Sequence, residues 1–216
     1  MRVLVVGASK GTGAELVAEL AERGHVVTAY SRQPGRHPDG VRTITGDVLD
    51  ADTVAKAMVG QDAVAVTLGI PDNPFRVRLT GRASSPLDVR SAGTRVVLDA
   101  MREHGVGRIV VQSTYGIGDT YRHLPLALKA FFVLGIKPQV QDHERQEQMV
   151  RASGLAWTIV RPTVLHDEPA DEPAYVDARD VAPTMKVSRR QVARVEADAL
   201  EDPHAPSQVL TVTARP

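Results

Sequence analysis

The sequence predicts an α/β fold, a single doubly wound domain in which helices cover both faces of a parallel sheet. One observation is the alternation of short β-branched runs with helical stretches along most of the chain. Another is that several of these runs are apolar at consecutive positions, as strands buried on both faces require. The third is the length of 216 residues, which suits one domain of this class.

Six of the runs are predicted strands. They are Arg2–Val6, His25–Tyr30, Val41–Thr45, Ala63–Leu68, Gly107–Gln112 and Trp157–Arg161. Helices are predicted where apolar residues recur at helical spacing, in the stripes that begin at Leu16 and at Val96. Strands and helices that alternate in this way form right-handed βαβ units.

The later part of the chain is less regular. We predict a loop over Pro71–Pro86 and two helical pieces over Pro125–Gly154, broken near Gly135 and Pro138. A helix over Ser188–Leu200 and a last strand over Ser207–Thr213 are predicted to follow. No linker separates a second domain. We therefore expect residues 1–216 to form one domain, with residues 163–216 contributing a small cap on the substrate side of the sheet.

Composition narrows the classes of function. Lys and Arg together number 26, as do Asp and Glu, and a net charge of zero does not favour a nucleic-acid or membrane-surface partner. The absence of cysteine excludes disulfides and thiol nucleophiles, and no metal-ligand spacing occurs, so no metal is expected. Leu124–Ile136 is too short to span a bilayer, and the first residues lack a signal-peptide pattern. We expect a cytoplasmic monomer or homodimer with a small-molecule partner.

A glycine-rich turn directly follows the first predicted strand. Gly7, Gly11 and Gly13 allow a tight turn and a close backbone approach, and the helix that opens near Gly11 directs its positive end at the turn. Ser9 and Thr12 add hydroxyl donors. In this context the pattern predicts a dinucleotide-binding Rossmann fold rather than a plain strand-to-helix turn.

The second strand predicts which dinucleotide binds. An acidic residue at its end would bind the ribose hydroxyls of NAD, but this chain has Arg32 there and Lys10 in the glycine turn. Two cations suit the 2′-phosphate of NADP, so we favour NADP(H) over NAD(H). The alternative is that Arg32 is a solvated loop charge.

Further cofactor contacts are predicted at the carboxyl ends of the other strands. Asp47 and Val48 are expected to pair with adenine, although Asp47 or Asp50 is alternatively a helix cap. The remaining predicted contacts are Leu68, Gly69, Ser113, Pro162, Thr163 and Val164. Open α/β sheets bind their ligands at this edge.

The chain resembles the atypical, NmrA-type branch of the short-chain dehydrogenase/reductase superfamily, and within it the biliverdin-IXβ reductase/flavin reductase group. The resemblance rests on stretches spread along the chain up to Pro162: Gly7–Gly13, Gly46–Leu49, Gly60–Val64, Ser91–Thr94, His104–Val106 and Ser153–Pro162. It implies a small NADPH-dependent reductase. Lys10 and Gly11 depart from the group and follow the superfamily's main branch instead.

The main branch's catalytic Tyr-x-x-x-Lys is absent, and its two positions correspond to Gln139 and His143. Reduction of a ketone needs such an acid, whereas a flavin, quinone or bilin spreads the new charge over a conjugated system. Thr114, Tyr115 and His143 are the candidate catalytic residues, with His143 a proton donor that titrates near neutral pH. Each also has a non-catalytic interpretation: Thr114 simply ends a strand, Tyr115 covers an edge of the core, and His143 lies on a solvated helix face.

Three functions follow from the sequence. The first is an NADPH-dependent oxidoreductase that transfers hydride to a conjugated acceptor such as a flavin, quinone or bilin-like molecule. The second is a non-catalytic NADP(H)-binding redox sensor or regulator of NmrA type. The third is a tailoring isomerase or dehydratase on the same fold, since a fold does not fix a function.

Overall fold

The computed structural model describes residues 1–69, 85–168, 170–202 and 207–216. Its main sheet has eight strands in the order β3-β2-β1-β4-β5-β6-β10-β8. These strands are β1 (Arg2–Val6), β2 (Val26–Ser31), β3 (Arg42–Thr45), β4 (Ala63–Val66), β5 (Arg108–Gln112), β6 (Ala156–Pro162), β8 (Tyr175–Asp177) and β10 (Gln208–Thr213). Only β8 pairs antiparallel, so the predicted doubly wound parallel sheet is confirmed.

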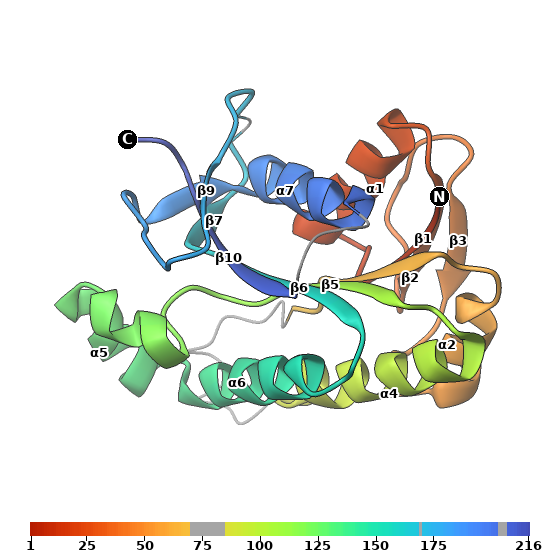
Figure 1. Ribbon diagram of the computed structural model, residues 1–216, viewed down its shortest axis with the longest axis horizontal. Helices are drawn as coiled ribbons and strands as arrows, with labels where there is room; N and C mark the ends of the chain where they lie inside the picture. The colour runs from red at the N-terminus through yellow and green to blue at the C-terminus, as the bar shows by residue number, and fades with distance from the viewer. Residues whose placement is uncertain (70–84, 169, 203–206) are drawn as a thin grey trace.

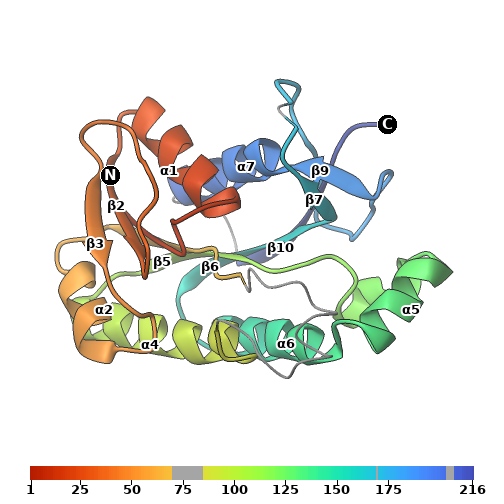
Figure 2. The same cartoon turned by 180° about the vertical axis from the view of Figure 1, so that it is seen from behind.

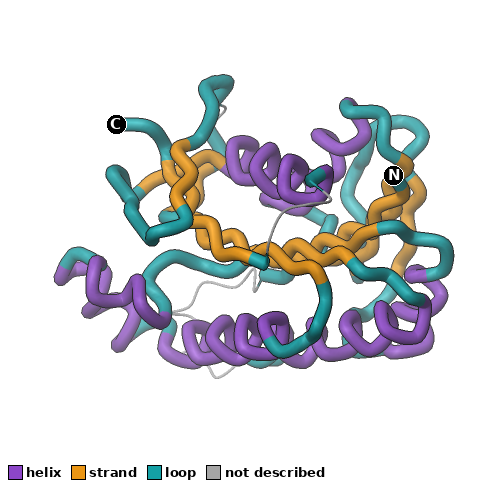
Figure 3. The backbone as a smooth tube through the Cα atoms, viewed as in Figure 1, coloured by secondary structure: helices purple, strands orange, loops and turns teal. Residues whose placement is uncertain are grey.

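Helices cover both faces of this sheet, which lies edge-on in Figure 1. The helices are α1 (Thr12–Glu22), α2 (Ala51–Met58), α4 (Val89–His104), the 3₁₀ turn η1 (Gly118–His123), α5 (Leu126–Leu134), α6 (Lys137–Arg151) and α7 (Arg189–Glu201). Helices α1 and α7 pack together on one face, and α2, α4 and α6 lie on the other (Figures 1 and 3). None of the helices within the described residues is long and apolar enough to cross a membrane.

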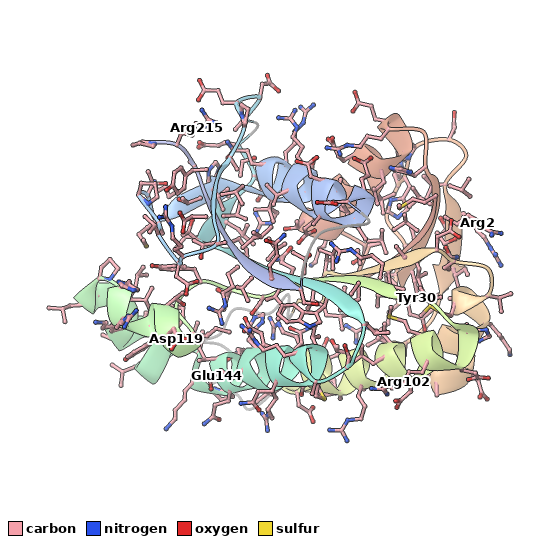
Figure 4. All side chains as sticks on the ribbon, in the orientation of Figure 1. Arg2, Tyr30, Arg102, Asp119, Glu144 and Arg215 are labelled. Carbon is pink, nitrogen blue, oxygen red and sulfur yellow. The ribbon has the colours of Figure 1, made fainter. Side chains whose placement is uncertain are left out.

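Side chains alternate between the two faces of the sheet along each strand, and each face has its own hydrophobic core. Val3 and Val5 of β1 belong to the core under α1 and α7, whereas Leu4 and Val6 belong to the core under α2 and α4. Successive strand residues point to opposite faces, and because both faces are covered the consecutive positions Val3–Val6 are all apolar. Figure 4 shows Tyr30 in the second core, between the sheet and the helices.

The predicted elements are found, with shifted ends. The strand predicted to reach Leu68 ends at Val66, and the predicted break in residues 125–154 lies between α5 and α6. Pro138 directly follows this break, in the first turn of α6, where a proline's missing N–H is tolerated. Most of the predicted 71–86 loop lies outside the described residues.

Much of the C-terminal quarter, which the sequence predicted to be a cap, belongs to the main layers of the fold. It contains the unpredicted parallel pair of β7 (Val164–His166) and β9 (Lys186–Ser188), which lies at the same end of the molecule as α5 (Figure 2). However, α7 belongs to a main helical layer and β10 pairs with β6 in the main sheet. Strands of three residues are too short to show a period in the sequence.

A buried ion pair fixes α6 to the sheet. The guanidinium of Arg161 on β6 donates two hydrogen bonds, of 2.9 and 2.7 Å, to the carboxylate of Glu147 on α6, and both side chains are buried. These bonds raise the pKa of Arg161 although burial opposes the charge. The pair holds the register of α6 and hence the position of His143, one turn earlier on the same helix.

Candidate functional site

One large cavity opens at the carboxyl ends of the strands. Its volume is about 740 Å³, which is within the range of small-molecule and cofactor sites. Of the predicted site residues, the cavity wall includes Gly7, Ser9, Lys10, Gly11, Thr12, Arg32, Asp47, Val48, Leu68, Gly69, Ser113, Thr114, Tyr115, His143, Pro162, Thr163 and Val164. Gly13 is the predicted residue that lies outside the wall.

The glycine turn is shaped by close backbone packing. Gly7 has a φ of +95°, and a Cβ there would lie 2.7 Å from the carbonyl oxygen of Thr67. A Cβ on Gly13 would overlap the carbonyl oxygen of Gly7 and lie 2.5 Å from Oγ1 of Thr67. Gly13 therefore lets α1 pack closely onto the ends of β1 and β4, and its role in cofactor binding stays a prediction.

The N-terminus of α1 lies at this cavity and has no side-chain cap. By contrast, Asp50 caps α2 by accepting from the amides of Asp52 and Thr53, and Ser188 caps α7 in a capping box. Unpaired amides at the positive end of a helix form a ready site for phosphate. This is the position that a dinucleotide's pyrophosphate takes in the fold.

Two cations lie at one end of the cavity. Lys10 and Arg32 are both exposed, and Nη2 of Arg32 donates a 2.6 Å hydrogen bond to Oγ of Ser85. The hydroxyl of Ser85 thereby orients the guanidinium. The two residues that the sequence singled out for the 2′-phosphate thus line the same cavity, and their contact with a phosphate stays a prediction.

The ambiguity over the cap of α2 is resolved in favour of Asp50. Asp47 instead accepts from the amide of Leu49 at 3.0 Å, and its carbonyl accepts from the hydroxyl of Tyr30 at 2.8 Å. Asp47 is exposed beside the buried Val48. Both residues line the cavity, where adenine contacts remain a prediction.

Thr114 and Tyr115 follow β5 at the cavity wall. The hydroxyl of Thr114 donates to the carbonyl of Tyr115 at 3.2 Å, and that of Tyr115 donates to the carbonyl of Asp180 at 3.4 Å. Burial and then the charge of Asp180 raise the pKa of Tyr115. Tyr30, the other tyrosine of the wall, also has a raised pKa, about 12. Neither phenol is acidified in the way that a ketone-reducing tyrosine requires.

His143 is buried on α6 instead of lying on a solvated helix face. Burial, and next the charge of Arg90, hold the pKa of His143 well below its usual value. The expectation that it titrates near neutral pH is therefore wrong. Burial and the nearby guanidinium of Arg90 both favour the neutral imidazole, and a neutral ring is a poor proton donor.

The far part of the cavity is apolar. Its wall there comes from η1's end, α5 and the start of α6, with Leu124, Leu128, Phe131, Phe132 and Ile136. The two phenylalanine rings meet edge to face, with their centroids 6.4 Å apart. The apolar stretch Leu124–Ile136, which is too short to span a bilayer, thus contributes to the cavity wall.

Several polar side chains of the wall hold buried atoms that have no hydrogen-bond partner within the described residues. They are Ser31, Arg90, Gln112, Ser113, His143 and Thr163. Buried polar atoms in proteins are nearly always paired, so a group of orphans around one cavity indicates a polar ligand. Together with the glycine turn and the uncapped α1, these atoms suit a dinucleotide.

The cavity wall also contains residues that were not predicted as site residues, above all Thr67, Arg90 and Arg189. Arg189 lies near Gly11 and pairs with Asp167 at 2.6 Å. It follows the cap of α7, which is far from the glycine turn in the sequence. Arg90 directly precedes the Ser91–Thr94 stretch that carried the resemblance, and this position was the available signal.

The chain is similar in sequence to curated proteins. An uncharacterized protein of Mycobacterium tuberculosis (strain ATCC 25618 / H37Rv) is 30% identical over 172 residues, covering 79% of this chain and 16% of that protein. The chain thus spans about a sixth of the length of the first curated relatives that it matches.

Solved structures share the fold. ChuY, an anaerobilin reductase from Escherichia coli O157:H7, has 23% identity and a TM-score of 0.74, with 100% of both chains covered. A short-chain dehydrogenase/reductase from Veillonella parvula DSM 2008, in complex with NADP, has 18% identity and a TM-score of 0.76, covering 98% of this chain and 93% of that one. At these identities, both show that the chain shares their fold.

A match to a protein-family model extends over most of the chain. A model of a family described as NAD(P)H-binding matches residues 7–203, from the glycine turn to beyond α7. It includes the uncapped start of α1 and the strand ends that line the cavity. The chain therefore belongs to this NAD(P)H-binding family.

Proposed function

We propose that the protein is an NADPH-dependent reductase that transfers hydride to a conjugated acceptor such as a flavin, quinone or bilin-like molecule. The observation that carries the proposal is one continuous cavity that joins a dinucleotide-type polar end to an apolar chamber. The reductase and short-chain dehydrogenase neighbours support the class of reaction, and the proposal goes beyond them in naming the acceptor's chemistry.

The polar end of the cavity suits the cofactor. When bound, NADPH would supply a hydride from its nicotinamide ring. The amides at the start of α1 would bind the pyrophosphate, and Lys10 and Arg32 would bind the 2′-phosphate. Ser113 and Thr163, whose hydroxyls have orphaned oxygens, would bind the cofactor near the strand ends.

The chemistry of the walls favours a conjugated acceptor. Hydride addition to a ketone places charge on one oxygen, which needs a positioned acid in the transition state. Tyr115 has a raised pKa and His143 a lowered one, so neither offers that acid. A conjugated acceptor spreads the charge, and water can then protonate it. The remaining task is to hold acceptor and cofactor face to face, to which Phe131 and Phe132 are suited.

A panel of acceptors tests the proposal. Purified protein should oxidise NADPH with saturable kinetics when FMN, menadione or a redox dye is added, and reduce cyclohexanone poorly or not at all. Tyr115→Phe is the matched variant, because it removes the hydroxyl and keeps the ring. Its rate with menadione should fall by much less than the roughly 10²-fold that the loss of a positioned acid causes. Brisk ketone reduction without flavin or quinone activity would contradict the proposal.

A further inference from the structure

Arg90 is a buried cation on the wall of the cavity. It lies in the first turn of α4, and only 8% of its surface is exposed. Its side-chain atoms Nε and Nη1 are buried, and neither has a hydrogen-bond partner within the described part of the chain. A buried guanidinium whose donors are unpaired is costly, and the usual compensation is an acceptor that the structure does not include.

The carboxylate nearest to Arg90 is engaged elsewhere. Asp142 on α6 is fully buried and accepts from the backbone amides of Arg90 and Ser91, each at 3.1 Å, and so caps the start of α4. Oδ2 of Asp142 lies 3.8 Å from Nη1 of Arg90, so the two side chains form an ion pair that is too long for a hydrogen bond. Asp142 therefore makes a cation tolerable at this position and leaves Nε and Nη1 of Arg90 without a hydrogen bond.

The position of Arg90 assigns it to the acceptor's part of the cavity. Helix α4 packs with α2 and α6 on one face of the sheet, whereas α1, whose N-terminus suits the pyrophosphate, packs on the opposite face. Arg90 is close enough to His143 of α6 to lower its pKa, and α5 with its phenylalanines precedes α6. The cofactor's phosphates already have α1, Lys10 and Arg32, and its nicotinamide end carries no anion.

We propose that Arg90 binds a carboxylate of the acceptor, so that the site takes flat, apolar, conjugated acceptors that carry a carboxylate group. The planar guanidinium fork can donate to a carboxylate from its unpaired Nε or Nη1, and the apolar wall of Leu128, Phe131 and Phe132 would bind the ring system. This inference rests on the proposed function in one respect, namely that the bound molecule is a hydride acceptor. The binding itself needs no turnover.

A pair of fluorescent probes separates the binding from the reaction. Anthracene-2-carboxylate and anthracene-2-carboxamide share one ring system and differ in charge, and neither is reduced by NADPH. With NADP⁺ present, wild type should bind the carboxylate roughly ten- to a hundredfold more tightly than the amide, as expected for a hydrogen bond to a charged group. Arg90→Met should lose this preference while its affinity for NADP⁺ stays within a few-fold.

Two further variants complete the test. Arg90→Lys keeps the charge without the fork, so part of the preference should remain even if Arg90→Met folds poorly. Arg95→Met, an exposed arginine on the same helix, is the matched control and should behave as wild type. The same pattern should appear in the KM, and much less in the kcat, for anthraquinone-2-carboxylate and its amide.

Equal binding of the two probes to wild type, including no measurable binding of either, would overturn the proposal. A loss of NADP⁺ affinity in Arg90→Met as large as the loss of carboxylate affinity would also overturn it, because Arg90 would then serve the cofactor. If the carboxylate preference depends on Arg90 but no acceptor is reduced, the proposed function fails and the carboxylate site stands.

Discussion

Arg32→Ala should weaken NADPH binding by roughly 10- to 150-fold and leave NADH binding within a few-fold of wild type. A hydrogen bond to a charged group contributes about 1.5–3 kcal/mol, and each ~1.4 kcal/mol is a factor of ten in affinity. The guanidinium lies on the cavity wall, oriented by Ser85, where a 2′-phosphate would meet it. NADH has no phosphate there and so loses nothing. Fluorescence titrations with each reduced cofactor measure both affinities.

Variants of two other basic residues test this prediction further, one with a smaller expected effect and one as a control. Lys10→Ala should give the same selective effect more weakly, because an ammonium makes a point contact. Arg36→Ala removes an exposed charge that is not part of the cavity wall and should change neither affinity. High salt should weaken NADPH binding more than NADH binding. If Arg32→Ala lowers both affinities equally, or wild type prefers NADH, the assignment of NADP fails.

Gly13→Val should abolish NADPH binding and lower the melting temperature together. A Cβ at this position overlaps the carbonyl oxygen of Gly7 and crowds Thr67, so the turn between β1 and α1 has to move. Overpacking of this kind costs about 1–3 kcal/mol, and displacing the turn also displaces the uncapped amides of α1. Cofactor titration and thermal unfolding report the two effects.

Gly107→Val is the matched control for Gly13→Val. A Cβ on Gly107 meets no described atom within 4 Å, so this variant should retain both NADPH binding and thermal stability. Unchanged cofactor binding in Gly13→Val would mean that the turn before α1 is not the phosphate site.

The regular elements were predictable because their signals are local. Consecutive apolar positions in Arg2–Val6 and Ala63–Val66 show strands that are buried on both faces, and the glycines place the turn that follows the first of them. Lys10 and Arg32 were found because the fold fixes which residues follow its first two strands.

The other half of the site depends on contacts between distant segments. Arg90 and Asp142 are 52 positions apart, and only the packing of α4 against α6 shows that the backbone of α4 binds the aspartate. The sequence around His143 is charged, so exposure was one expectation, but Glu147 and Arg161 hold this face of α6 against the sheet and bury the imidazole. Burial, which shifts the pKa, follows from tertiary packing and not from neighbours in the chain.

The most direct test of hydride transfer is an anaerobic single turnover with NADPH deuterated at C4 on one face or the other of the nicotinamide ring. The protein is loaded with each deuterated NADPH and mixed rapidly with menadione, and the absorbance of the reduced nicotinamide is followed. We expect the absorbance to fall at a rate that saturates with menadione, and to fall more slowly for one of the two deuterated forms than for the other. Cofactor that stays bound and unoxidised with menadione, FMN and a redox dye would contradict the account and leave the protein a sensor of NADP(H).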